Sequence, residues 1–159
     1  MMLRLKNNAF TRSLKGYHLV LADCGDGCAS QLRSALEKLP VEMVETPRHA
    51  DIVFVSGILT HALLPRVKVM FQGLSKPYFT VKVGTCMGAL NKAFEDPSKN
   101  YAIGARLKTF LPFDLVIEGC PPSDDAIFNK IETLITYMDI TPEISVTLDK
   151  RVDKGVFEP

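Results

Sequence analysis

The sequence predicts an α/β fold, with a doubly wound and mainly parallel sheet that carries helices on both faces. Short apolar runs typical of strands alternate along the chain with stretches whose apolar residues recur at helical spacing. The run at 50–56 is almost entirely apolar and β-branched, as in a strand buried on both faces of a parallel sheet. The 159 residues are 47% apolar and 23% charged, which suits one compact domain.

The expected elements follow one another closely. In chain order they are a strand at 17–23, a helix at 30–39, a short strand at 41–45, the buried strand at 50–56, a helix at 61–73, and strands at 78–83 and 113–118. The helix at 30–39 is predicted because Leu32, Ala35, Leu36 and Leu39 share one helical face, and Pro40 ends it.

The last helix has the clearest signals. Pro121 and Pro122 precede Ser123, a candidate N-cap, and Asp124 and Asp125 would lie in the first turn, where the helix dipole favours negative charge. One helical face then collects the apolar residues Ile127, Phe128, Ile131, Leu134, Ile135 and Met138. This face is expected to pack against the sheet.

Two terminal segments lie outside the predicted domain, which covers residues 17–140. Residues 1–16 contain Arg4, Lys6, Arg12 and Lys15 but no acidic residue, and we expect a basic arm that is either solvated or packed on a partner. Residues 141–159 have mixed charges without helical periodicity, and we expect a tail that is disordered or ordered against another chain.

Charge and hydropathy exclude several classes of protein. Lys and Arg number 19 against 18 Asp and Glu, a net charge of +1, so a polycation that binds nucleic acid is not expected. The longest apolar region, 52–65, is interrupted by polar residues and is too short to span a bilayer. The N-terminus is too polar for a secretion signal, and we expect a soluble, intracellular chain.

Four cysteines are the most informative residues: Cys24, Cys28, Cys86 and Cys120. Buried free thiols are the simplest interpretation, but the contexts CGDGC, GTCMG and EGCPP place glycine or proline within two residues of each one, which favours loops. These loops follow three of the expected strands. Because parallel strands end at the same edge of a sheet, the fold would bring the four thiols together there.

Four thiols at one locus could hold zinc or an iron–sulfur cluster, or could be unrelated. Structural zinc sites usually combine two close pairs of ligands, whereas only Cys24 and Cys28 form such a pair. The pattern suits a [4Fe–4S] cluster better, because separate loops can each bind one corner. Gly25, Gly27, Gly84 and Gly119 would then donate backbone N–H groups toward the cluster, although each could be a turn glycine.

Several segments resemble a known family, the small cluster-bearing subunit shared by complex I and nickel–iron hydrogenases. The resemblance covers roughly residues 17 to 138 and lies in ADIVFVSG, in GTCMG, and in LPFDLVIEGCPPSDDAIFNKIETL, of which the Gly-Cys-Pro-Pro element before a helix is the most specific. It implies a flavodoxin-like domain that docks on a large subunit and holds one [4Fe–4S] cluster at their interface. The chain itself would relay electrons and break no bonds.

The chain is similar to the single-cluster versions of this family, because it has no cysteines for the additional cluster domain of the multi-cluster hydrogenase small subunits. The complex I member of the family has adjacent cysteines at the first ligand position, whereas energy-converting hydrogenases have Cys-x-x-Cys followed by a Glu. Here Cys24 and Cys28 are one residue further apart, and Gln31 replaces that Glu. The separated pair favours the hydrogenase branch, and we expect Cys24 to remain a ligand.

The resemblance therefore implies an electron-transfer subunit of a membrane-bound, energy-converting hydrogenase on the cytoplasmic side of the membrane. Its partners would be a large [NiFe] hydrogenase-like subunit, a ferredoxin-like iron–sulfur subunit and integral membrane subunits, with no nucleic acid. One alternative is the corresponding small subunit of a complex I-type NADH-quinone oxidoreductase, which passes electrons to quinone. An alternative from another class is a zinc-binding or scaffold module of flavodoxin-like fold.

Overall fold

The computed structural model describes residues 13–22, 27–75, 78–86 and 113–140. At its centre is a five-stranded sheet in the order β2-β1-β3-β4-β5, in which every neighbouring pair is parallel. The strands are β1 (Leu14–Val20), β2 (Val41–Met43), β3 (Ile52–Ser56), β4 (Phe79–Val83) and β5 (Leu115–Ile117). This order is that of the flavodoxin-like doubly wound fold, so the predicted fold class is confirmed.

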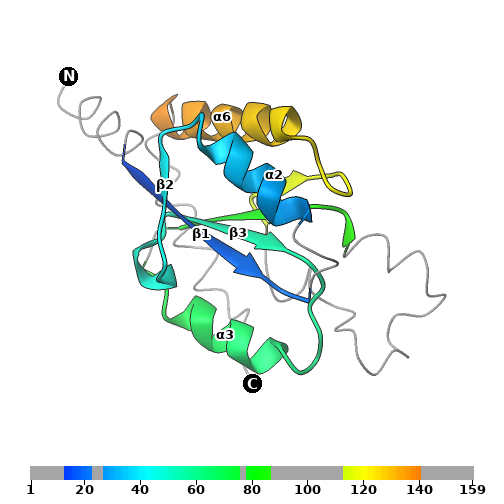
Figure 1. Cartoon of the computed structure of the whole chain (residues 1–159). Helices are drawn as coiled ribbons and strands as arrows, with labels where there is room; N and C mark the ends of the chain where they lie inside the picture. Colours follow the sequence, from blue (N-terminus) through cyan, green and yellow to red (C-terminus); the bar gives the residue numbers. More distant parts are fainter. Residues whose placement is uncertain (1–12, 23–26, 76–77, 87–112, 141–159) are drawn as a thin grey trace.

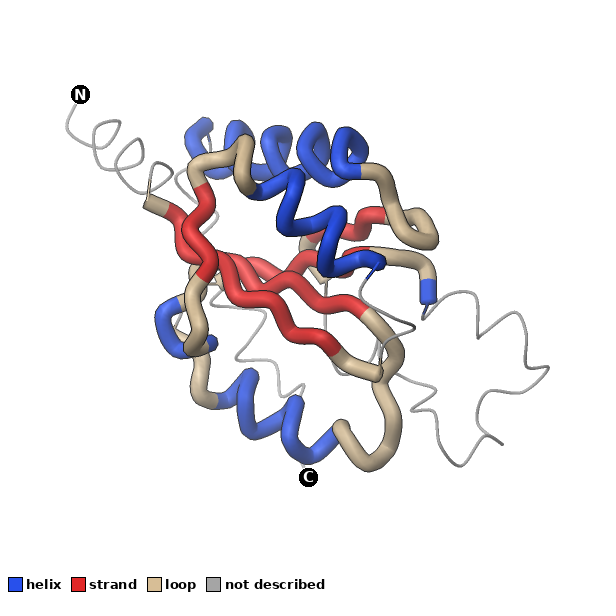
Figure 2. The backbone as a smooth tube through the Cα atoms, in the orientation of Figure 1, coloured by secondary structure: helices blue, strands red, loops and turns tan. Residues whose placement is uncertain are grey.

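Helices cover both faces of the sheet. Figure 1 shows α2 (Gly27–Leu36) and α6 (Asp124–Ile140) side by side on one face and α3 (Leu64–Gln72) on the other. The tube in Figure 2 shows the same three layers, with the strands between the helices. The chain leaves β1 toward β2 at one edge and then returns past β1 to β3, and this reversal makes the fold doubly wound.

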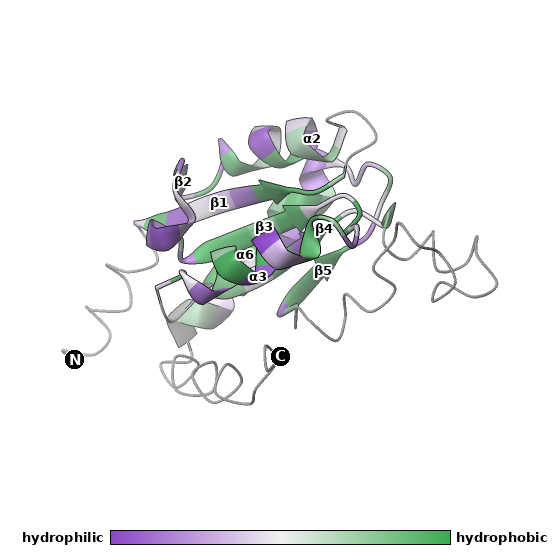
Figure 3. Cartoon of the chain, turned by 90° about the horizontal axis from the view of Figure 1, so that it is seen from below, coloured by the Kyte–Doolittle hydropathy of each residue, from purple (hydrophilic) through white to green (hydrophobic). Residues whose placement is uncertain are grey.

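Each face of the sheet has its own apolar core. On the side of α2 and α6, Phe54, Val81 and Ile117 pack with Ile127 and Ile131, all fully buried. On the side of α3, the core consists of Leu21, Ala50, Val53, Val55, Leu59, Val67, Phe71 and Leu74. Figure 3 shows the hydrophobic character of β3, whose five residues are all buried, as expected of a strand covered on both faces.

The first strand begins earlier than the sequence predicts. β1 starts at Leu14 rather than at residue 17, and so its first residues belong to the segment 1–16 expected to be a basic arm. Leu14 is fully buried and pairs with Val41 of β2. Gly16 obscured this start in the sequence, yet its missing side chain is required, because a Cβ there would lie 2.9 Å from the Phe54 ring.

Helix α2 also lies earlier than expected, at Gly27–Leu36 instead of 30–39. The N–H groups of Lys38 and Leu39 donate to carbonyls three residues back, so the chain tightens and leaves the α-helix before Pro40. At the other end, Cys28 lies in the first turn of the helix and not in a loop as predicted.

The last helix matches its prediction. The hydroxyl of Ser123 accepts the N–H of Ala126 at 3.3 Å, as an N-cap does, and α6 begins at Asp124. Ile127, Ile131, Ile135 and Met138 are buried, and Phe128 and Leu134 pack at the edge of the same core. Within the described part of the chain, no helix has the length and apolar character needed to cross a membrane.

Candidate metal centre

Three of the four cysteines lie in the described part of the chain, and all three follow strands of the parallel sheet. Cys28 is in the first turn of α2, after β1, whereas Cys86 follows β4 and Cys120 follows β5. The carboxyl ends of parallel strands share one edge of the sheet, which is where ligands bind in doubly wound folds. Cys24 and Gly25 lie outside the described residues, so the predictions for both remain expectations.

The segments after β1 and β4 meet at Cys28 and Gly84. Cys28 is only 3% exposed, and a Cβ built on Gly84 would lie 2.9 Å from its sulfur, closer than a real Cβ comes to another atom. Gly84 has a positive φ of 94°, which side-chain-bearing residues rarely adopt. The missing side chain of Gly84 thus leaves room for the Cys28 thiol beside the end of β4.

The segments after β4 and β5 meet at Thr85 and Gly119. The backbone N–H of Thr85 donates to the Gly119 carbonyl at 2.9 Å, and the Thr85 hydroxyl donates to the same oxygen at 3.1 Å. One residue earlier, the N–H of Gly84 donates to the Ile117 carbonyl at 2.8 Å. This N–H is engaged within the sheet, which differs from the prediction that Gly84 donates toward a cluster. Gly84 contributes space instead.

The segments after β1 and β5 also touch. A Cβ on Gly27 would lie 3.6 Å from the Pro121 ring, in ordinary van der Waals contact, so the start of α2 lies beside the residue that follows Cys120. Gly119 has a φ of 146°, and a side chain there would overlap Pro122. Cys120 is exposed and Cys86 is partly exposed, whereas Cys28 is buried. The three cysteines thus differ in solvent exposure, from one in the core to one at the surface.

The segments that meet here carry most of the residues predicted for the site: Cys28, Cys86, Cys120, Gly27, Gly84 and Gly119. No disulfide joins the described cysteines. Among the described residues, no three His, Cys, Asp or Glu side chains are grouped so that they could hold one metal ion. Thiolates are the usual ligands of iron–sulfur clusters, in which each thiolate binds a different iron.

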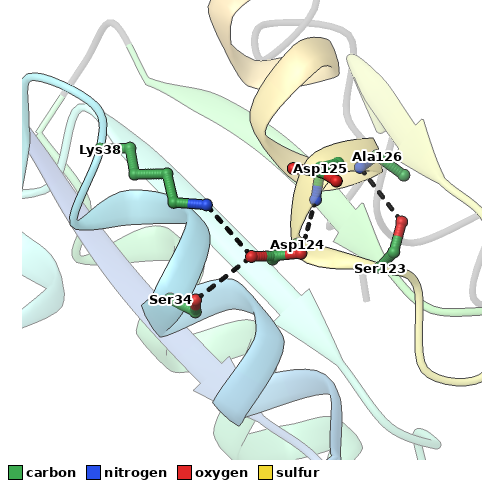
Figure 4. A network of polar contacts seen from close by, with 6 residues as sticks. All are labelled: Ser34, Lys38, Ser123, Asp124, Asp125 and Ala126. Carbon is green, nitrogen blue, oxygen red and sulfur yellow. Dashed lines mark hydrogen bonds and ion pairs between the residues drawn. The ribbon is translucent and has the colours of Figure 1, made fainter.

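A polar network ties α2 to the start of α6, as Figure 4 shows. The Asp124 carboxylate accepts the Lys38 ammonium at 3.2 Å and the Ser34 hydroxyl at 3.4 Å. Its other oxygen accepts the backbone N–H of Asp125 at 2.9 Å. The hydrogen bond and charge of Lys38 lower the pKa of Asp124. Because α2 carries Cys28 and α6 follows Cys120, this network connects two of the cysteine-bearing segments.

Three polar contacts near the site are absent from the sequence-based predictions. They are the Thr85–Gly119 bonds, the Lys38–Asp124 pair, and the bonds of the Asp114 carboxylate with the Thr80 N–H at 2.8 Å and the Thr80 hydroxyl at 3.1 Å. Each joins residues more than thirty positions apart, so no local pattern indicates the pairing. Asp114 comes directly before β5, and an acidic residue at the start of an apolar run is a signal that the sequence does offer.

Comparison with protein families finds a match over residues 15–134 to the family of the NADH ubiquinone oxidoreductase 20 kDa subunit. A probable membrane-bound hydrogenase subunit mbhJ of Pyrococcus furiosus is 31% identical over 121 residues, which is 72% of this chain and 70% of that protein. An NADH-quinone oxidoreductase subunit of Clostridium beijerinckii is 36% identical over 89 residues, 56% of this chain and 50% of that protein.

Solved structures share the fold. A chain of the membrane-bound sulfane sulfur reductase, an archaeal respiratory membrane complex, superimposes with a TM-score of 0.68 at 21% identity, covering 88% of this chain and 78% of that one. A chain of an NAD+-reducing [NiFe]-hydrogenase in the H2-reduced state gives 0.56 at 18% identity, covering 78% of this chain and 92% of that one. At these identities the likeness concerns the fold alone.

Proposed function

Because the chain belongs to the family of the NADH ubiquinone oxidoreductase 20 kDa subunit, we propose that it is an electron-transfer subunit that holds one [4Fe–4S] cluster. We place that cluster next to the catalytic large subunit of a membrane-bound, energy-converting nickel–iron hydrogenase. The observation that carries the proposal is the meeting of three cysteine-bearing segments at one edge of the sheet. This edge is where a doubly wound fold binds its ligand.

Cys24, Cys28, Cys86 and Cys120 would be the four ligands. Thiolates are the usual ligands of iron–sulfur clusters, and these four lie after three strands that end at the same edge. When bound, the cluster would take up and release single electrons. Gly25, Gly27 and Gly119 remain proposed as residues whose backbone approaches it closely.

The protein groups around the thiols have distinct roles in this proposal. Burial of Cys28 against Gly84 keeps water from one side of the site, and low solvent exposure is one of the factors that set a cluster's potential. Cys120 lies at the surface and so faces a partner that would exchange electrons with this subunit. Burial thus separates a protected side of the site from a side open to the partner.

The alignment with the hydrogenase subunit supports the hydrogenase branch. It spans 72% of this chain, against 52% to 67% for NADH-quinone oxidoreductase subunits B of several bacteria. A complex I-type subunit that passes electrons to quinone is the second candidate, because the matching family takes its name from that enzyme. In either case the partners would be a large subunit, a ferredoxin-like subunit and integral membrane subunits, with the chain on the cytoplasmic side of the membrane.

Metal analysis of the full chain, purified without oxygen, tests the cluster. We expect about four irons and four acid-labile sulfides per chain, as the cluster formula requires. Replacement of Cys24 or Cys120 by Ser should lose or convert the cluster. The control Asp26→Asn removes a neighbouring charge but no thiol, and should keep the iron content while shifting the potential.

Two results would contradict the proposal. One zinc per chain in place of iron would support the zinc-binding alternative. An unchanged four-iron spectrum in the Cys24→Ser variant, together with its loss in Asp26→Asn, would show that the ligand set is wrong.

A further inference from the structure

The strand that leads to Cys120 has few backbone bonds to hold it. β5 has three residues, Leu115–Ile117, and is an outermost strand of the sheet, so it pairs with β4 alone. Side-chain hydrogen bonds reinforce it at both ends. The Asp114 carboxylate binds Thr80 before the strand, and the Thr85 hydroxyl binds the Gly119 carbonyl after it.

We propose that the Thr85 hydroxyl is a positioning group that sets the spacing of Cys86 and Cys120, an inference that rests on the proposed cluster site. Thr85 directly precedes Cys86, and Gly119 directly precedes Cys120. The two bonds from Thr85 to one carbonyl oxygen therefore tie together the residues next to both thiols. Thr85 itself would bind no iron.

The Thr85 hydroxyl adds to what the backbone bond between Thr85 and Gly119 provides. The bond from the Thr85 N–H to the Gly119 carbonyl lies just past the last paired residues of β4 and β5, Val83 and Ile117. Ladders are weakest at such ends, where local opening is easiest. Gly119 adds freedom at this point, because its φ of 146° lies in a region that glycine enters easily. A second bond to the same carbonyl restricts that freedom.

The test uses three variants of the full chain. Thr85→Val keeps the branched shape but removes the hydroxyl, and Thr85→Ser restores a hydroxyl. Thr133→Val is the matched control, since its hydroxyl also donates to a backbone carbonyl, that of Asn129 at 2.7 Å, on the exposed side of α6. Circular dichroism and thermal unfolding establish that each variant is folded before it is compared.

Two measurements are made on each variant. In the reduced chain without iron, a short dimaleimide reports by mass spectrometry how often Cys86 and Cys120 are joined. In the chain with its cluster, the rate of iron loss to a chelator and the electron paramagnetic resonance spectrum report on the site. For Thr85→Val we expect about a fivefold lower yield of the joined pair and about fivefold faster iron loss, the size expected for one hydrogen bond.

The outcomes separate this inference from the proposed function. Thr85→Ser and Thr133→Val should resemble the unchanged chain in both measurements. The inference is overturned if Thr85→Val and the unchanged chain give the same yield of Cys86 joined to Cys120. It is also overturned if Thr133→Val lowers this yield as much as Thr85→Val does, or if the two thiols are not joined in the unchanged chain. If the unchanged chain takes up no iron, the proposed function fails, while the joining of Cys86 to Cys120 still decides the role of Thr85.

Discussion

Among single residues, Asp124 illustrates how one side chain connects distant parts of the chain. Its carboxylate lies at the start of α6 and binds Lys38 and Ser34 of the α2 region, about ninety positions away in sequence. Both partners lie near the surface, so salt screens the pair and its contribution to the stability of the fold is small. The contribution of the Asp124 carboxylate to stability is detected most directly through the pH dependence of unfolding.

The lowered pKa of Asp124 predicts the sign of that dependence. A carboxyl whose pKa is lower in the folded chain contributes stability above its unfolded pKa, near the ordinary value of 3.8, and this contribution is lost as the pH falls through the folded pKa. Asp124→Asn should therefore melt below the unchanged chain at neutral pH, and the difference should shrink below about pH 4.

Thermal unfolding between about pH 7 and pH 2 measures this difference. Asp125→Asn is the control, because it removes the same charge from the next residue of the same helix turn. A difference between Asp124→Asn and the unchanged chain that stays constant over the whole range would contradict the prediction.

At the scale of elements, α6 is held mainly by its apolar face. Ile127 and Ile131 are fully buried in the core that α6 shares with α2 and the sheet, whereas Glu132 on the same helix is exposed. The Ser123 cap satisfies one N–H at the helix start, which is worth about 1 kcal/mol. Burial of the large aliphatic side chains is the larger contribution.

We therefore expect Ile131→Ala to lower the free energy of unfolding by about 2–5 kcal/mol, because it leaves a cavity in the core shared by α6 and the sheet. Glu132→Ala, one residue away, should change it by less than about 0.5 kcal/mol. Urea denaturation of the full chain measures both. A loss below about 1 kcal/mol for Ile131→Ala would show that the interior of this layer is looser than the structure indicates.

For the molecule as a whole, the edge of the sheet that carries the cysteines is the expected contact with the large subunit. Ala22 lies at this edge, where it exchanges two backbone hydrogen bonds with Ile58 and leaves its side chain exposed. Val69, which is 68% exposed on α3, lies on a helix that carries none of the cysteines. The two positions therefore distinguish this edge from the rest of the surface.

A native pulldown from the source cells should recover the chain with a large hydrogenase-like subunit and a ferredoxin-like one. Ala22→Glu should reduce this recovery at least about tenfold, because it places an unpaired charge in the contact. Val69→Glu, with the same added charge, should leave it unchanged. Equal recovery with both variants would mean that the contact with the large subunit lies elsewhere, and recovery of a quinone-reducing assembly would favour the complex I branch.

The sequence alone determined the order of strands and helices, the buried β3, the capped α6 and the set of cysteines. These features follow from patterns within a few residues: apolar runs, helical spacing, and a serine before two aspartates. Gly16 within β1 broke such a pattern and so hid the start of that strand, although the glycine is what lets Phe54 pack there.

Only the tertiary structure decided how the cysteine-bearing segments meet. The contact of Gly84 with Cys28, the bonds of Thr85 to Gly119 and the pairing of Lys38 with Asp124 join residues from different segments of the chain. Such contacts depend on the register and order of the strands, which place the ends of β1, β4 and β5 at one edge. A local pattern records which face of an element is apolar, but it carries no information about which distant residue that element will meet.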